Sequence, residues 1–243
     1  MNYRIILAYD GTDYEGWQMQ AGTRTIQGVL SEALARIDGA PVIVHGAGRT
    51  DSGVHAEGQV ASFRLRNERE CDLLQRALNG NLPFDIRVLN AERVSDDFNA
   101  RFDARSKTYR YQIYVAEVMS PFLRRYAWHY PYPLDPDRLA ADGRVLLGTH
   151  DFTAFTVASS EVKSHIRTIT SVGLETGGPC WRMTFTGNGF LRYMVRTMVG
   201  ALLDANRGRL RAGSIAALLE SRERRLAGAS APAGGLTMVK VEY

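Results

Sequence analysis

Cysteine and lysine are both scarce in this sequence of 243 residues. The two cysteines, Cys71 and Cys180, lie far apart and belong to no CxxC pair. Structural zinc sites need closely spaced cysteine and histidine ligands, and disulfides are typical of secreted proteins, of which this chain carries no sign. The five histidines show no metal-ligand spacing either. We therefore expect neither a bound metal nor a disulfide.

Long hydrophobic runs and nucleotide-binding motifs are also missing. No apolar run approaches the roughly 20 residues that cross a bilayer, and the first apolar stretch is too short for the core of a signal peptide. The sequence contains no Walker motif and no GxGxxG that opens a helix, so no nucleotide cofactor is indicated. We expect a cytoplasmic protein with no membrane segment and no cofactor.

Arginine supplies almost all of the positive charge. Of the 30 basic residues 27 are arginine, and the formal net charge is +4. Arginine makes bidentate contacts with phosphate and stacks on bases, which favours a nucleic-acid partner. A genome rich in G and C also enriches arginine codons, so the composition leaves both explanations open.

The first half of the chain alternates strands and helices. Apolar residues recur at helical spacing after Thr25, which is a suitable N-cap, and β-branched residues mark the strands. The expected strands are 3–9, 41–45, 59–65 and 86–94, and the expected helices are 26–37 and 71–78. The opening part therefore predicts the order β-α-β-β.

The second half repeats this pattern loosely. Asp135 or Asp137 can start one helix, and Ser214 can cap another. The expected strands are 108–115, 166–174, 181–186 and 238–242, and the expected helices are 135–147, 190–205 and 214–220. The low-complexity stretch 227–235 is expected to be flexible. We predict an α+β fold of two similar halves, 1–105 and 106–243, whose sheets join without a clear linker.

One loop between two expected strands concentrates reactive residue types. Its sequence at positions 48–56 is GRTDSGVHA. Glycine lets the backbone approach a ligand closely, Arg49 can hold phosphate, and Thr50 can offer a hydroxyl. Asp51 next to an arginine stays ionised. The alternative is a turn in which Asp51 bonds its own backbone, and His55 is interpreted as structural.

The strand at 108–115 combines aromatic and basic residues. Alternation places Tyr109 and Tyr111 on one face and Arg110 on the other. Such a mixture is typical of surfaces that contact an RNA backbone and stack on bases. The alternative is a half-buried edge strand with ordinary aromatic packing.

Two arginines stand four residues apart in the apolar stretch 190–205. Arg192 and Arg196 would share one face of the expected helix. A buried arginine needs an anionic partner, which is either a structural salt bridge or a functional acid. The preceding Gly187-Asn188-Gly189 predicts free backbone N–H groups that can receive a phosphate.

Five segments, in their order along the chain, together indicate one family. They read YDGTDYEGWQ at 9–18, GRTDSGVHA at 48–56, KTYRY at 107–111, GNGFLRYMVR at 187–196 and APAGGL at 231–236. With these segments, which run through the whole chain, the sequence resembles the bacterial tRNA pseudouridine synthase A family. The segment around Asp51 is highly specific. Ser52 stands where many members have Ala, and we expect no consequence for the reaction.

The resemblance implies two ferredoxin-like halves that share one central mixed, mainly antiparallel β-sheet with helices on one face. It also implies a homodimer that binds the anticodon arm of tRNA and isomerises uridines 38, 39 and 40 to pseudouridine, without metal or cofactor. By resemblance Asp51 is the nucleophile, Arg196 pairs with it, and Tyr109 packs on the target base as a candidate to remove the C5 proton. Arg49 enters the RNA to hold the base out, and Leu236 packs beside the uracil.

The sequence leaves the route of the reaction and two other function classes open. Asp51 can attack C1′, add to C6 or deprotonate C2′. A catalytically silent RNA-binding module would have no need of this carboxylate. A phosphohydrolase built on Asp10, Asp13 and Asp51 would need a divalent metal.

Overall fold

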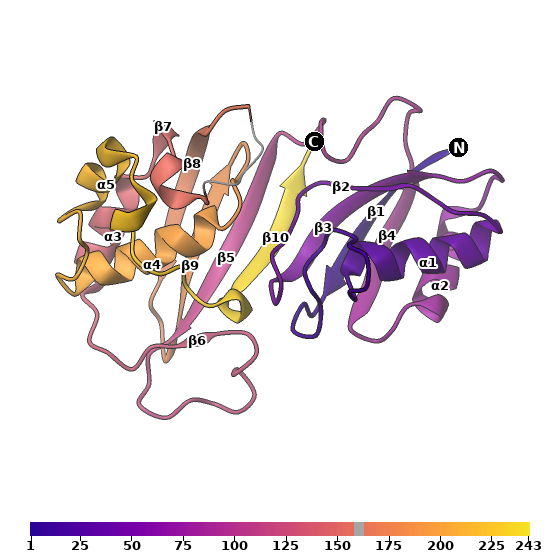
Figure 1. Ribbon diagram of the computed structural model, residues 1–243. Coiled ribbons are helices and arrows are strands. Elements are labelled where there is room, and N and C mark those ends of the chain that lie inside the picture. Colours follow the sequence, from indigo (N-terminus) through magenta and orange to yellow (C-terminus); the bar gives the residue numbers. More distant parts are fainter. Residues whose placement is uncertain (158–162) are drawn as a thin grey trace. The chain divides into compact units, whose positions relative to one another are not determined.

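The chain divides into two structural units, each with its own strands and helices (Figure 1). The computed structural model describes residues 1–157 and 163–243. Unit 1 comprises Met1–Arg105 together with Thr237–Tyr243, and unit 2 comprises Ser106–Leu236. The C-terminal strand therefore belongs to the first unit, whereas the sequence had placed residues 106–243 together.

Unit 1 follows the order β-α-β-β-α-β and gains one strand from the C-terminus. Its elements are β1 (Asn2–Tyr9), α1 (Ile26–Asp38), β2 (Val44–Gly46), β3 (His55–Arg64), α2 (Cys71–Asn81), β4 (Ile86–Arg93) and β10 (Leu236–Glu242). The strands lie in the order β4-β1-β3-β10, and β2 pairs with β3. All pairs are antiparallel except β10 with β3, where Thr237 lies opposite His55. This element order is that of a ferredoxin-like half.

The residues of unit 1 account for these elements. Tyr3, Ile5 and Leu7 alternate along β1 and are fully buried, because successive strand residues point to opposite faces. The hydroxyl of Thr25 accepts a hydrogen bond from the N–H of Gly28 and caps α1, as predicted. The helices α1 and α2 contact each other and therefore cover the same face of the sheet (Figure 1).

The strands of unit 2 pair mainly in antiparallel fashion, and its described residues also form three α-helices. Its elements are β5 (Ser106–Tyr114), β6 (Trp128–His129), α3 (Pro136–Arg144), β7 (Gly148–Asp151), β8 (Ile166–Glu175), β9 (Cys180–Gly187), α4 (Met194–Asn206) and α5 (Ile215–Ser221), with short 3-10 turns η1 (Thr153–Phe155), η2 (Arg224–Leu226) and η3 (Ala233–Gly235). The strands lie in the order β5-β9-β8-β7, and β6 runs parallel to β5. The side chains of Asp135 and Ser214 cap α3 and α5, as predicted.

The fold class is α+β, as predicted, but several element bounds differ. β2 begins at Val44 and not at 41, and α3 ends at Arg144 and not at 147. The helix expected over 190–205 begins only at Met194, because Tyr193 adopts a left-handed conformation with φ 61°. β6 and β7 were not predicted. No helix in the described ranges is long and apolar enough to span a membrane.

Candidate active site

The loop that carries Asp51 connects β2 to β3 and is fastened to the segment 10–18. The N–H of Trp17 donates to the carbonyl of Thr50 over 3.0 Å, and the N–H of Gly53 donates to the carbonyl of Tyr14 over 3.2 Å. The N–H of Val54 closes a turn on the carbonyl of Asp51. The sequence segments 9–18 and 48–56 are therefore joined by backbone hydrogen bonds.

Two glycines allow the segment 10–18 to lie against the Asp51 loop. A Cβ on Gly11 would lie 2.0 Å from the carbonyl oxygen of Val54. A Cβ on Gly16 would lie 2.6 Å from that of Thr50, and Gly16 has φ 84°, which L side chains rarely adopt. Both obstacles are backbone atoms, which cannot rotate away. The position of the Asp51 backbone thus depends on the absence of two side chains elsewhere in the chain.

Side chains of β1 and β3 hold the same loop from inside. The hydroxyls of Thr50 and Tyr9 are 2.9 Å apart, and the amide of Gln59 donates to the carbonyl of Gly48 over 2.7 Å. The sequence had suggested that Thr50 offers its hydroxyl to a ligand. Thr50 is instead buried, and its hydroxyl bonds to Tyr9 in the core. Asp51 is half-buried.

His55 stands where the loop enters β3. Its Nδ1 accepts a hydrogen bond from the N–H of Gly11 over 3.0 Å, and the imidazole is buried. This contact is a further link between β3 and the segment 10–18. It agrees with the structural interpretation of His55.

In unit 2, Tyr109 and Tyr111 share the buried face of β5, as the alternation predicted. The ring of Tyr109 packs edge-on against Phe190 with centroids 5.0 Å apart. The hydroxyl of Tyr111 donates to the carbonyl of Pro232 over 2.8 Å. Burial raises the pKa of Tyr111, and the nearby positive charge of Arg196 partly offsets this.

Arg196 lies in the first turn of α4 and is tied to the segment 228–236. Its Nε donates to the carbonyl of Ala231 over 2.7 Å, and the N–H of Ala231 donates back to the carbonyl of Arg196 over 3.0 Å. Its guanidinium also stacks over the ring of Tyr193, 5.2 Å from the centroid. Arg192 stacks over the same ring at 5.0 Å but precedes the helix, so the prediction that both arginines share a helix face was wrong.

The stretch 227–235 was expected to be flexible, yet the segment 228–236, which overlaps it, is packed along α4. Ala231 and Gly235 are buried. A Cβ on Gly200 in α4 would lie 2.2 Å from the carbonyl oxygen of Ala229, and a Cβ on Gly235 would lie 2.6 Å from the ring of Tyr111. Its small residues reflect close packing, which a composition rich in Ala and Gly does not distinguish from flexibility.

The free backbone N–H groups expected at Gly187-Asn188-Gly189 are not found at Asn188. Gly187 is part of β9, and the N–H of Asn188 donates to the carbonyl of Thr168 over 3.1 Å. The side-chain oxygen of Asn188 accepts from the N–H of Thr168 in return. These groups close the end of the sheet.

Comparison with known proteins shows the family to which this chain belongs. The family model for tRNA pseudouridine synthase matches residues 5–103 and 144–243. This chain belongs to the tRNA pseudouridine synthase family. It is 47% identical to tRNA pseudouridine synthase A of Solibacter usitatus over 99% of this chain and 98% of the relative. It is 44% identical to the enzyme of the same name from Streptococcus equi subsp. equi and 42% identical to that from Latilactobacillus sakei, again over 99% of this chain and 98% of each relative.

The residues that the synthase resemblance singled out fall in both units. Asp51 and the exposed Arg49 lie in unit 1, whereas Tyr109, Arg196 and Leu236 lie in unit 2. Within unit 2 the segment 228–236 links Arg196 to Leu236. The pairing of Asp51 with Arg196 stays a prediction.

Several supporting residues of this family member escaped the sequence analysis. Tyr9, Gln59 and the pair Gly11 and Gly16 hold the Asp51 loop, yet only the segment 9–18 as a whole had been noticed. The recurrence of glycine beside the aromatic residues of that segment is the signal that points to close backbone packing. The left-handed Tyr193 leaves no such signal.

Alkaline pH tests the burial of Tyr9 beneath the Asp51 loop. Burial raises the pKa of Tyr9 to about 12, partly offset by its hydrogen bonds with Thr50 and Gln59. A raised folded-state pKa contributes stability that is complete below the unfolded value near pH 10 and is lost as the pH rises through about 12. We expect the free energy of unfolding of the native protein to fall more steeply across this window than that of Tyr9→Phe, by up to about 1.4 kcal/mol per pH unit.

Urea unfolding at several pH values between about 10 and 12 measures this difference. Tyr132→Phe, at an exposed ring, is the matched control. Equal slopes for the native protein and Tyr9→Phe would contradict the expectation.

Proposed function

We propose that this chain isomerises uridine to pseudouridine at positions 38, 39 and 40 in the anticodon stem-loop of tRNA, with Asp51 as the nucleophile. The observation that carries the proposal is the family match along both halves of the chain, with Asp51 in the segment of highest specificity. The enzyme is then an isomerase that moves the ribose from one ring atom of uracil to another.

The chemistry needs a carboxylate and no second substrate. The N1–C1′ bond breaks, a C5–C1′ bond forms, the proton on C5 leaves to water, and N1 takes up a proton. Nothing is oxidised or reduced in this exchange. Asp51 can start it by attack at C1′, by addition to C6 or by removal of a proton from C2′. Covalent routes split one difficult step into easier ones.

The hydrogen bonds around Asp51 support its role. Backbone hydrogen bonds on both sides fix the loop that carries the carboxylate, which lowers the entropic cost of bringing Asp51 to the reacting atom. We assign Arg196 to pair with this carboxylate and favour its ionised form. Tyr109 is assigned to pack on the target base. Its buried ring is already oriented by Phe190.

The uridine must leave its stack, which costs a few kcal/mol. We assign Arg49 to fill the space left in the RNA, a role that its exposure on the loop supports. Leu236 is assigned to pack beside the uracil. Its place in the chain supports this, because it directly precedes Thr237, which pairs with His55 at the end of the Asp51 loop.

The oligomeric state and the cellular location are also part of the proposed function. We propose a homodimer in the cytoplasm that binds the anticodon arm. Residues 106–243, as the second half of one catalytic unit, complete the cleft around Asp51. Sedimentation equilibrium of the purified protein measures the oligomeric state.

A tritium-release assay tests the proposed reaction. The protein is incubated with tRNA that carries tritium at uridine C5, with EDTA present, and tritium in water is counted. We expect release in the presence of EDTA, because the proposed steps use no metal. Binding of tRNA without release would instead indicate a silent RNA-binding module. Metal-dependent release of phosphate from RNA would indicate the phosphohydrolase built on Asp10, Asp13 and Asp51.

A further inference from the structure

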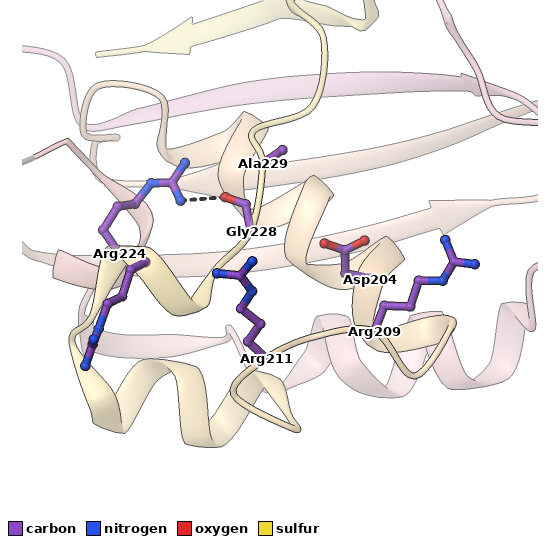
Figure 2. Close-up of a pocket in the computed structure, with 7 residues that line it drawn as sticks. Asp204, Arg209, Arg211, Arg224, Gly228 and Ala229 are labelled. Carbon is purple, nitrogen blue, oxygen red and sulfur yellow. Dashed lines mark hydrogen bonds between the residues drawn. The ribbon is translucent and has the colours of Figure 1, made fainter.

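A basic pocket of about 620 Å³ lies in unit 2 at the end of α4. Its lining includes Arg209 and Arg211 from the loop after α4, and Arg224 and Arg225 from η2. Figure 2 shows the guanidinium of Arg211 pointing towards Gly228, with the carboxylate of Asp204 beside it. The candidate active-site residues of unit 2 are not among those that line it.

Positive charge is in excess in this pocket. The described residues that line it include four arginines and one acid, Asp204. Arg225 has its own partner in Glu223. Arg209 and Arg211 are exposed, and within the described ranges no ion pair holds either guanidinium. Clustered like charges repel each other, so an anion in the pocket would lower the electrostatic energy of these arginines.

Hydrogen bonds hold the side chain of Arg224 in place in the lining of the pocket. Its Nη1 donates to the carbonyl of Gly228 over 2.7 Å, and its Nη2 donates to the hydroxyl of Ser230 over 3.0 Å. Its Nε is buried and meets no acceptor in the described part of the chain. Burial lowers the pKa of Arg224. The guanidinium of Arg224 is thus held in a partly buried place where no carboxylate from residues 1–157 or 163–243 pairs with it.

We propose that this pocket binds a phosphate group of the tRNA backbone, away from the uridine that reacts. The inference rests on the proposed tRNA substrate and adds a second contact to it. Guanidinium groups bind phosphate oxygens in a bidentate fork, and several together suit one tetrahedral anion. No aromatic ring is among the described lining residues, so nothing there stacks on a base. A backbone phosphate therefore fits better than a free nucleotide.

The choice of variant follows from the contacts of Arg224. The hydroxyl of Ser230, which accepts from Arg224, is 2.8 Å from that of Thr197, and the next residue, Ala231, bonds to Arg196. Replacing Arg224 would disturb the candidate active site as well as the pocket. Arg209 and Arg211 carry no such contacts in the described chain and are the residues to change.

The test compares tRNA binding by two charge-matched double variants over a range of salt concentrations. Arg209→Gln with Arg211→Gln removes two charges from the pocket. Arg138→Gln with Arg144→Gln removes two exposed charges from α3 in the same unit. Each phosphate contact contributes about one unit to the slope of log K against log salt. We expect the pocket variant to lose about 10-fold in affinity and roughly 1 to 2 in slope, and the α3 variant to match the native protein.

Phosphate ethylation of the tRNA identifies the partner atom. Ethyl groups at the phosphates that lie in the pocket should weaken binding by the native protein and leave binding by the pocket variant unchanged. Equal slopes for the native protein and the pocket variant would overturn the proposal. The proposal would also be overturned if inorganic phosphate or uridine monophosphate bound the native protein and not the variant while the two proteins bound tRNA with equal affinity. The pocket would then take a free phosphate and not one of the tRNA backbone.

Two controls separate this proposal from the proposed reaction. Thermal unfolding of both double variants checks that they fold like the native protein. All binding is measured in an Asp51→Ala background, in which the protein without further changes stands for the native one, so turnover plays no part. If the native enzyme releases no tritium but the slopes differ as expected, the isomerase proposal fails and the phosphate site stands.

Discussion

Replacing Asp51 by Asn is expected to lower tritium release from C5-labelled tRNA by on the order of 10⁴-fold or more, the loss seen when a nucleophile is removed from a group of residues that act together. Asparagine has nearly the same shape but cannot act as a nucleophile or base. The turn around it should persist, because Val54 donates to the backbone carbonyl of residue 51 and not to its side chain. Single-turnover release, with tRNA affinity measured beside it, tests this.

Ser52→Ala is the matched control for Asp51→Asn. Ser52 is the adjacent, exposed residue, and its hydroxyl donates to the carbonyl of Tyr14 over 3.3 Å. We expect Ser52→Ala to keep the rate of release and Asp51→Asn to keep the affinity for tRNA. Release by Asp51→Asn at a rate near that of the native enzyme would show that another group starts the reaction.

Gly11→Ala is expected to destabilise the protein by about 3 kcal/mol and to reduce activity further than that loss explains. The added Cβ would lie 2.0 Å from the carbonyl oxygen of Val54, so one of the two backbone segments must move. Movement of Val54 displaces Asp51, since the two are joined by a hydrogen bond across the turn. Urea unfolding gives the free energy, and tritium release measured well below the unfolding midpoint gives the activity of the folded protein.

The control for Gly11→Ala is Gly80→Ala. Gly80 lies in α2, and a Cβ there would have no heavy atom within 4 Å. Alanine is the better helix former, so this variant should be stabilised by up to about 1 kcal/mol with no change in activity. A Gly11→Ala protein as stable as the native one would contradict the close approach of the segment 10–18 to the Asp51 loop.

Features set by neighbouring residues were predictable from the sequence. Thr25, Asp135 and Ser214 cap the helices that follow them, because an N-cap needs only its own side chain and the next few N–H groups. The alternation of Tyr109 and Tyr111 on β5 was predictable for the same reason. The Asp51 loop was recognised from its composition and its resemblance to a family, and its location between two strands followed from their alternation.

Contacts between distant parts of the chain were beyond the sequence. The approach of Gly11 to Val54 joins residues 43 positions apart, and no local pattern encodes it. The hydrogen bond between Arg196 and Ala231 fastens a stretch of small residues that had been expected to be a flexible loop. The start of α4 was misplaced because only the global fold compensates the roughly 1–3 kcal/mol that a left-handed Tyr193 costs.

The place of β10 in unit 1 has a consequence for synthesis on the ribosome. Chains emerge from the N-terminus, and early domains usually fold before later ones are made. Here Thr237 pairs with His55, and Tyr243 donates to the carbonyl of Ala100. Unit 1 cannot complete its sheet until Thr237–Tyr243 has been translated. Co-translational folding of the N-terminal unit therefore ends only after the whole of unit 2 has been translated.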